Sequence, residues 1–265
     1  MLVEIGTFPV SDPVARALGA QELEPEESVN FGLGATLTPG RFNLTVDYYQ
    51  VEIDDRIVVT ENLQGAAVVA LLRAAGFNNI TSARFFINGI DTRTRGIDVV
   101  GTYRLPETGF GNFTLTAGFN RNRTKITDRA VLPTLPGLTL FGRVESLRIE
   151  RGQPREKINL GLDWDSGILG ATLRSNRYGD VRIAGASLAA DETLEPRWVT
   201  DVEIRAEANE TVQFAIGANN VFDVYPTRVQ TGGIFGTNPY FLPYSSSSPF
   251  GFNGRFLYGR MSFQF

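Results

Sequence analysis

The last nine residues of the chain, 257–265, alternate between apolar or small side chains and polar or amphipathic ones. One parity holds Leu257, Gly259, Met261, Phe263 and Phe265, and the other holds Tyr258, Arg260, Ser262 and Gln264. Successive side chains of a β-strand point to opposite faces, so this segment predicts a strand with one apolar and one polar face. An exposed apolar edge strand invites aggregation in water, whereas the wall of an outer-membrane barrel requires an apolar outside and a polar lumen. The segment favours a barrel wall, and its alternative is the last strand of a soluble β-rich binding or structural protein, covered by a second sheet.

Composition excludes most catalytic chemistry. The 265-residue chain has no histidine and no cysteine, so it lacks the commonest general base, thiol nucleophiles, thiolate metal ligands and disulfides. We therefore expect no enzyme, no catalytic residue, no metal site and no cofactor. The net charge of −4 argues against nucleic-acid binding, which requires a clustered cationic surface. The longest helix-like apolar stretch, 66–75, is far shorter than the ~20 residues of a membrane helix, so embedding in a membrane has to be by strands.

Alternating segments recur along the chain and predict nine strands, joined by connections of two very different lengths. Short turns fall at 39–40, 106–111, 166–167 and 209–210, and long connections at about 54–84, 127–153, 178–195 and 223–251. Outer-membrane barrels have short periplasmic turns and long extracellular loops. The sequence thus predicts an all-β fold of about nine long antiparallel up-and-down strands in a curved partial transmembrane barrel. Apolar positions near helical spacing in residues 62–76, with Gly76 as a C-cap, predict a short helix in one extracellular loop.

Charged residues gather on one parity of the predicted strands. We assign a polar, lumen-facing surface to Asp98, Arg104, Asp163, Arg174, Asp201, Glu203, Arg205 and Arg260. An arginine or lysine on the lipid face costs about 2–4 kcal/mol at the membrane midplane, so the opposite parity should be nearly free of charge. The apolar parity reverses between Tyr48 and Val51, which predicts a bulge or a stretch above the membrane.

Cations near the ends of two strands admit two interpretations. Arg121, Arg123 and Lys125, together with Arg148, Arg151 and Arg155, have the charge to bind an anionic siderophore or the phosphates of lipopolysaccharide. Solvated strand ends account for them equally well. The acidic run that includes Glu22 and Glu24 has no EF-hand spacing, so a solvated loop is favoured over a calcium site.

Several segments together resemble a known family. They are Gly217-Ala218-Asn219-Asn220-Val221-Phe222-Asp223 followed by Tyr225-Pro226, residues 91–98, residues 47–51, and the terminal residues 259–265. Over essentially its whole length the chain resembles the C-terminal β-barrel portion of a TonB-dependent outer-membrane receptor. The resemblance implies location in the outer membrane and a 22-stranded barrel, closed around an N-terminal plug, that imports iron-siderophore complexes, cobalamin or similar scarce solutes with energy relayed from the inner membrane.

The resemblance also implies which parts and partners to expect. Residues 1–265 correspond to the C-terminal part of the barrel, and we recognise no signal peptide, plug or TonB-contacting segment, so we expect a fragment that is inactive alone. Its expected partners are outer-membrane lipid, the missing strands and plug of the same receptor, the barrel assembly machinery and a siderophore-like solute. Leu257, Gly259, Met261, Phe263 and Phe265 would form the assembly signal. Asn219, Asn220, Val221, Phe222 and Asp223 form the family motif, whose amides we expect to tie off a strand at a turn.

Overall fold

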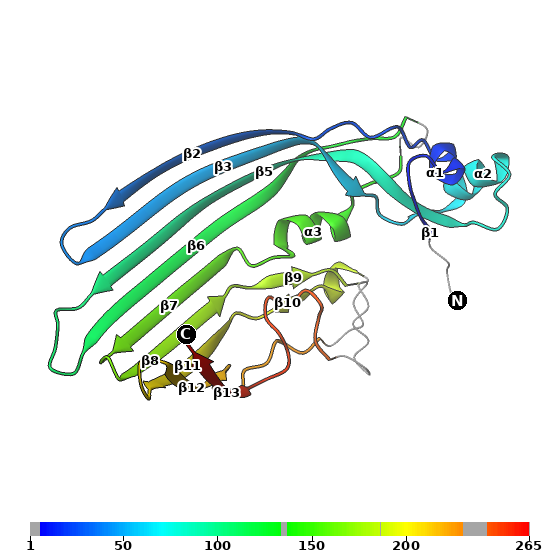
Figure 1. Cartoon of the computed structure of the whole chain (residues 1–265). Coiled ribbons are helices and arrows are strands. Elements are labelled where there is room, and N and C mark those ends of the chain that lie inside the picture. Colours follow the sequence, from blue (N-terminus) through cyan, green and yellow to red (C-terminus); the bar gives the residue numbers. More distant parts are fainter. Residues whose placement is uncertain (1–5, 134–136, 186, 230–242, 265) are drawn as a thin grey trace. The chain divides into compact units, whose positions relative to one another are not determined.

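Nine long strands follow one another in the sheet in the order of the sequence. The computed structural model describes residues 6–133, 137–185, 187–229 and 243–264, which contain every strand below (Figure 1). The order is β2 (Glu27–Leu37), β3 (Phe42–Val59), β5 (Ser82–Arg104), β6 (Asn112–Arg129), β7 (Glu156–Asp165), β8 (Leu169–Tyr178), β11 (Arg197–Glu207), β12 (Val212–Asn219) and β13 (Phe256–Phe263). Each pair from β6 to β13 is antiparallel. The predicted up-and-down order of nine strands is confirmed. Within the described residues β2 and β13 are the two ends of an open sheet.

Contacts divide the chain into two compact units. The first comprises residues 1–31, 50–95 and 124–150, and its core joins helix and loop residues to the first part of β5, where Ala83, Phe85 and Ile90 are buried. Leu18, Leu63, Val68, Leu72 and Phe85 are fully buried there. The short strands β1 (Gly6–Phe8) and β4 (Leu63–Gln64) both pair with the beginning of β5, β1 in parallel and β4 antiparallel. The long connections of this unit therefore fold into a packed body.

Of the helices α1 (Pro13–Ala17), α2 (Ala66–Ala74) and α3 (Arg143–Arg151), only α2 could be predicted from the sequence. Helix α2 occupies the predicted position, and Gly76 follows it with a φ of 93°, as a C-cap glycine requires. Helices α1 and α3 were not predicted. Helix α1 is only five residues long, and α3 has no buried residue, so neither shows a clear apolar period. The carboxylate of Glu61 caps α3 by accepting hydrogen bonds from the backbone N–H groups of Val144 and Glu145, at 3.2 and 3.4 Å.

Two strands extend further into the long connections than the sequence indicated. β3 continues to Val59 and β5 begins at Ser82, so the predicted excursion over 54–84 is shorter. Asp55 has a positive φ of 54° within β3, and its backbone N–H donates to the Asp91 carboxylate at 3.0 Å. The sequence does not predict these extensions, because apolar and polar residues do not alternate at the end of β3 or at the beginning of β5. No helix among the described residues is both long and apolar enough to cross a bilayer.

The second unit, residues 32–49, 96–123 and 151–265, contains the hairpins from β7 to β13, and the sheet there is curved (Figure 1). Its tightest turn lies between β7 and β8, where Gly167 has a φ of 90° and its N–H donates to the Asp165 carboxylate at 2.9 Å. In the next connection, strands β9 (Val181–Ile183) and β10 (Glu192–Leu194) pair with each other, with the short 3-10 helix η1 (Leu188–Ala190) between them. Val181 and Leu194 form a small core there with Val229. These short elements stand on the long-loop side of the hairpins.

Candidate functional site

The register of the second unit separates two faces of the sheet across six strands. Residues that pair directly share a face, and one such row runs through Leu115, Leu162, Leu173, Val202, Ala218 and Leu257. The adjacent row, on the opposite face, runs through Thr114, Asp163, Thr172, Glu203, Gly217 and Tyr258. The first row contains only aliphatic side chains and the second contains two carboxylates, two hydroxyls and a phenol. We call the face of the second row the polar face and the other the apolar face.

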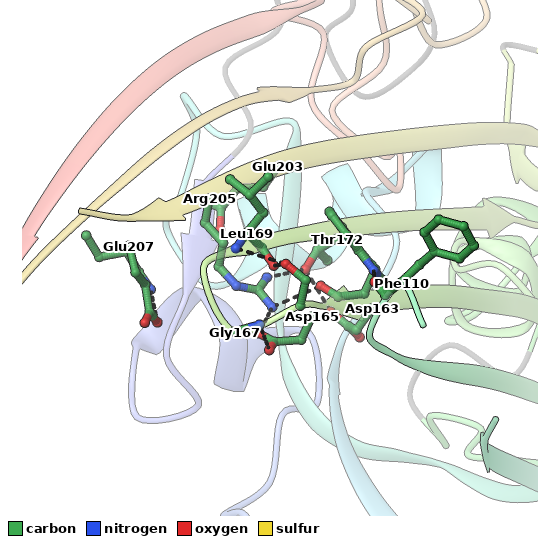
Figure 2. Close-up of polar contacts among 12 residues, drawn as sticks. Phe110, Asp163, Asp165, Gly167, Leu169, Thr172, Glu203, Arg205 and Glu207 are labelled. Atoms are coloured by element: carbon green, nitrogen blue, oxygen red, sulfur yellow. Dashed lines mark hydrogen bonds and ion pairs between the residues drawn. The ribbon is translucent and has the colours of Figure 1, made fainter. Parts of the chain in front are cut away.

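Charges on the polar face are paired by contacts between strands (Figure 2). The Arg205 guanidinium donates to the Thr172 hydroxyl at 3.2 Å, the Asp165 carboxylate at 3.3 Å and the Trp164 carbonyl at 3.4 Å. The Thr172 hydroxyl in turn donates to the Asp163 carboxylate at 2.7 Å. Arg205 lies across Gly170, where a Cβ would meet its guanidinium at 2.5 Å. Glycine in β8 therefore leaves the space in which an arginine from β11 reaches β7.

A second set of contacts joins β11 to β13 across β12. The Glu203 carboxylate accepts a hydrogen bond from the Tyr258 hydroxyl at 2.9 Å and one from the Arg260 guanidinium at 3.0 Å. The β12 residues opposite Tyr258 and Arg260 are Gly217 and Ala215, the two smallest residue types. A Cβ on Gly217 would collide with the Tyr258 ring. The terminal strand is thus fastened to the strand beyond its neighbour.

Residues of the polar face line a hollow of about 600 Å³. Six of the eight residues predicted for the lumen line it: Asp163, Arg174, Asp201, Glu203, Arg205 and Arg260. Three cations balance three anions, so this surface selects neither sign of charge strongly. Asp98, which accepts a hydrogen bond from the Asn120 amide, and Arg104 lie on β5 and do not line this hollow. No group of metal-ligating side chains is present in the described residues.

Aromatic side chains gather where the strands of the second unit meet the long loops. The Tyr178 ring stacks on Phe250 with 5.7 Å between centroids, and the Lys157 ammonium lies 5.2 Å from the Tyr178 centroid. Nearby in the sequence, Arg151 forms an ion pair with Asp180. These residues were missed as a group because they lie in or beside segments that the sequence identifies only as long connections. The group combines aromatic faces with cations, which suits planar or anionic ligands.

A second aromatic stack lies in the last long connection. The Tyr244 ring stacks on Tyr225 with 6.0 Å between centroids and on Phe252 with 5.8 Å. The Asp223 carboxylate raises the pKa of Tyr225, chiefly through its negative charge. Tyr225 is therefore a neutral hydrogen-bonding group at physiological pH.

Comparison with known proteins identifies the family. The model of the TonB dependent receptor-like β-barrel matches residues 5–221. The chain belongs to this family. It is accordingly an outer-membrane protein, as the sequence predicted. Comparison with curated protein sequences gives no significant match.

Solved structures show the same fold. The copper transporter OprC is 18% identical with a TM-score of 0.60 over 92% of this chain and 32% of its own. The FrpB iron transporter of Neisseria meningitidis is 16% identical with a TM-score of 0.60 over 91% of this chain and 32% of its own. The ferric enterobactin receptor of Pseudomonas aeruginosa is 16% identical with a TM-score of 0.57 over 91% and 31%. The chain spans about a third of the length of each of these receptors.

The segment 219–223, which the sequence predicts to be a family motif, forms the turn that ends β12. The Asn220 side chain donates to the Val224 carbonyl at 2.8 Å and accepts from the Val224 N–H at 2.9 Å. The Asn220 backbone N–H donates to the Asp201 carboxylate at 2.7 Å, and the Asp223 carboxylate accepts from the Arg255 N–H at 2.8 Å. Asn220 and Asp223 both have positive φ, at 52° and 57°. The structure thus contains the hydrogen bonds that a strand-terminating role requires.

Replacing Asn220 by alanine is expected to destabilise the protein by about 1–2 kcal/mol, because the two partly buried hydrogen bonds between its side chain and Val224 are lost. Asn219→Ala is the matched control, since Asn219 is exposed and lines the polar hollow. Chemical unfolding in lipid vesicles of the full-length protein that carries either change measures the difference. Equal free energies of unfolding would show that the Asn220 amide does not support the turn.

The terminal strand presents its residues as the alternation indicates. Leu257, Gly259, Met261 and Phe263 pair with Ala218, Ile216, Phe214 and Val212, all on the apolar face. Leu257, Met261 and Phe263 are each more than half exposed. Phe265, the last residue of the predicted assembly signal, lies outside the described residues. The described part of the signal is an exposed apolar stripe on an edge strand.

Proposed function

We propose that the chain forms part of the wall of an outer-membrane active-transport receptor for scarce solutes, such as iron-siderophore complexes or cobalamin. The observation that carries this proposal is the separation of the two faces: an aliphatic row across six strands lies beside a row of carboxylates, hydroxyls and a phenol. A membrane barrel with a hydrated lumen requires such faces. The names of the structural neighbours, a copper transporter, an iron transporter and a ferric enterobactin receptor, support uptake of metal-containing solutes.

The wall requires further strands to work. Among the residues that the structure describes, β2 and β13 each pair on one side only, and an unpaired row of backbone groups cannot be solvated by lipid. We infer that residues 1–265 act as the C-terminal part of a receptor whose remaining strands and plug complete the barrel. The 265-residue chain by itself should then give no steady conductance in a planar bilayer. Stable conductance from this chain alone would contradict the inference.

The aromatic and cationic residues beside the long loops are the proposed contact for the solute. The Tyr178–Phe250 stack, with Lys157 beside it, offers a planar surface and a positive charge to a chelating ligand that carries negative charge. No catalytic step is required of these residues. The polar hollow lies on the same face, where a plug or the passing solute would meet balanced charges.

Uptake in cells tests the proposal. The gene is deleted, and uptake of radiolabelled iron in a panel of siderophores and of radiolabelled cobalamin is followed in solute-limited cells. Loss of uptake of one solute, restored by the gene and abolished by an uncoupler of the inner-membrane potential, is the expected result. Unchanged uptake of every solute in the panel would contradict the proposed function for these substrates.

We further infer that the terminal strand is the segment by which the barrel assembly machinery recognises the protein. Its exposed apolar stripe, Leu257, Met261 and Phe263, continues in sequence to Phe265. Deletion of Phe265 is expected to reduce the amount inserted in the outer membrane far more than Ser246→Ala does. Equal insertion of the two variants would remove the support for this role.

A further inference from the structure

The apolar face of the second unit contains a hollow of about 710 Å³. Its lining includes the small residues Gly101, Ala117 and Ser175 and the larger apolar residues Phe119, Leu160 and Leu162. Ala117, Leu160 and Ser175 form one cross-strand row, which places the hollow along β6, β7 and β8. An apolar ligand that can enter a concave surface is better suited to this hollow than a flat protein surface is.

Arginines stand at the long-loop end of this hollow, on the same face. Arg177 pairs with Ile158 and with Trp198, and Ile158 itself lines the hollow. Arg121 shares the parity of Phe119 and pairs with Glu156. The Glu156 carboxylate lies 3.6 Å from the Arg121 guanidinium and 3.8 Å from that of Arg177, so it holds the two cations together.

The charges at this end sum to a positive patch. Arg123 is exposed and follows Arg121 on the same parity of β6, so three arginines face one carboxylate. The Arg121 side chain is 66% exposed and the Arg177 side chain 26%. Lys157 lies on the opposite parity of β7 and adds nothing to this patch. Cations placed where an apolar surface ends complement a ligand with an anionic head and an apolar tail.

We propose that this surface is a binding site for an anionic membrane lipid, with the head-group phosphate at Arg121, Arg123 and Arg177 and one acyl chain in the apolar hollow. Arginine binds phosphate by two parallel hydrogen bonds, and each cation near an anionic lipid surface adds to the attraction. The proposal rests on the membrane-facing role of the apolar face in the proposed function. It commits to a lipid because free phosphate would leave the adjoining hollow unfilled.

Native mass spectrometry of the full-length protein tests the site. The protein is delipidated in detergent and exposed to an equimolar mixture of dioleoylphosphatidylglycerol and dioleoylphosphatidylcholine, and the retained lipids are counted. We expect the anionic lipid to be enriched over the neutral one. In the double variant R121Q/R177Q, this enrichment should fall by a factor of about five for each arginine removed. The matched control is R174Q, an exposed arginine of β8 on the polar face, which should keep the enrichment. Equal enrichment in the double variant, or equal loss in the control, would overturn the proposal.

The share of the acyl chain is tested separately. Ala117→Phe adds a ring to the lining of the hollow on the apolar face, and it is expected to lower retention of dioleoylphosphatidylglycerol several-fold. An excess of inorganic phosphate is expected to leave the retained lipid in place. Unchanged retention in Ala117→Phe, or displacement by free phosphate, would contradict the proposed tail position. These measurements count lipid and not solute, so their failure is distinguishable from failure of the transport proposal.

Discussion

Replacing Ile216 by arginine is expected to destabilise the membrane-inserted receptor chain by about 2–4 kcal/mol, the cost of an arginine facing lipid near the bilayer midplane. Ile216 lies in the middle of β12, on the apolar face, and is 67% exposed. In a soluble protein an exposed site like this one would tolerate the change within about 0.5 kcal/mol. The substitution therefore separates a lipid-facing wall from a soluble sheet.

The matched control is Gln213→Arg on the same strand. Gln213 lies on the polar face and lines the polar hollow, where an added cation stays hydrated. Both variants are made in the full-length receptor and folded into lipid vesicles, and their unfolding by guanidinium chloride is followed by heat-dependent electrophoretic mobility. A loss of stability in Gln213→Arg as large as that in Ile216→Arg would contradict the assignment of the two faces.

The alternation of apolar and polar residues predicts which side chains share a face of the sheet, but it does not predict which side chains of different strands contact each other. The parity of Asp163, Asp201 and Glu203 follows from sequence, because a strand turns every second residue to the same side. Which strand residue lies opposite which depends on turn length and register, so the contact of Arg205 with Asp165 across β8 had no sequence signal. The same holds for the links from Glu203 to Tyr258 and Arg260.

The long connections were the least predictable part. Their cores are built from residues far apart in sequence, such as Leu18, Leu72 and Phe85, and no local period reveals such packing. Helix α3 shows the same dependence on distant residues, since Glu61 caps it. The aromatic stacks of Tyr178 with Phe250 and of Tyr225 with Tyr244 likewise join segments that sequence spacing does not connect. The proposed solute contact depends on the same kind of packing, because it joins Tyr178 and Lys157 at the ends of β8 and β7 to Phe250 in a long connection.

Gly217→Val is expected to weaken the attachment of the terminal strand by about 1–3 kcal/mol, the usual cost of overpacking. A side chain on Gly217 would occupy the space taken by the Tyr258 ring, which lies across β12 so that its hydroxyl reaches Glu203. The control is Gly259→Val in β13, because no atom lies within 4 Å of a Cβ added there. Guanidinium unfolding in vesicles compares the two variants, and similar stabilities would show that the space beside Gly217 is not needed.

Removing the ring should rescue the valine variant. In the double variant Gly217→Val/Tyr258→Ser the collision no longer exists, so the combined loss should be smaller than the sum of the two single losses by about 0.5–3 kcal/mol. Strict additivity would mean that Tyr258 does not occupy the glycine position in the membrane. A rescue would show that a glycine on the polar face leaves space for the side chain of a neighbouring strand, as Gly170 does for Arg205. Small residues in β8 and β12 would then be what lets side chains of the polar face lie flat across the sheet and join strands that are not adjacent.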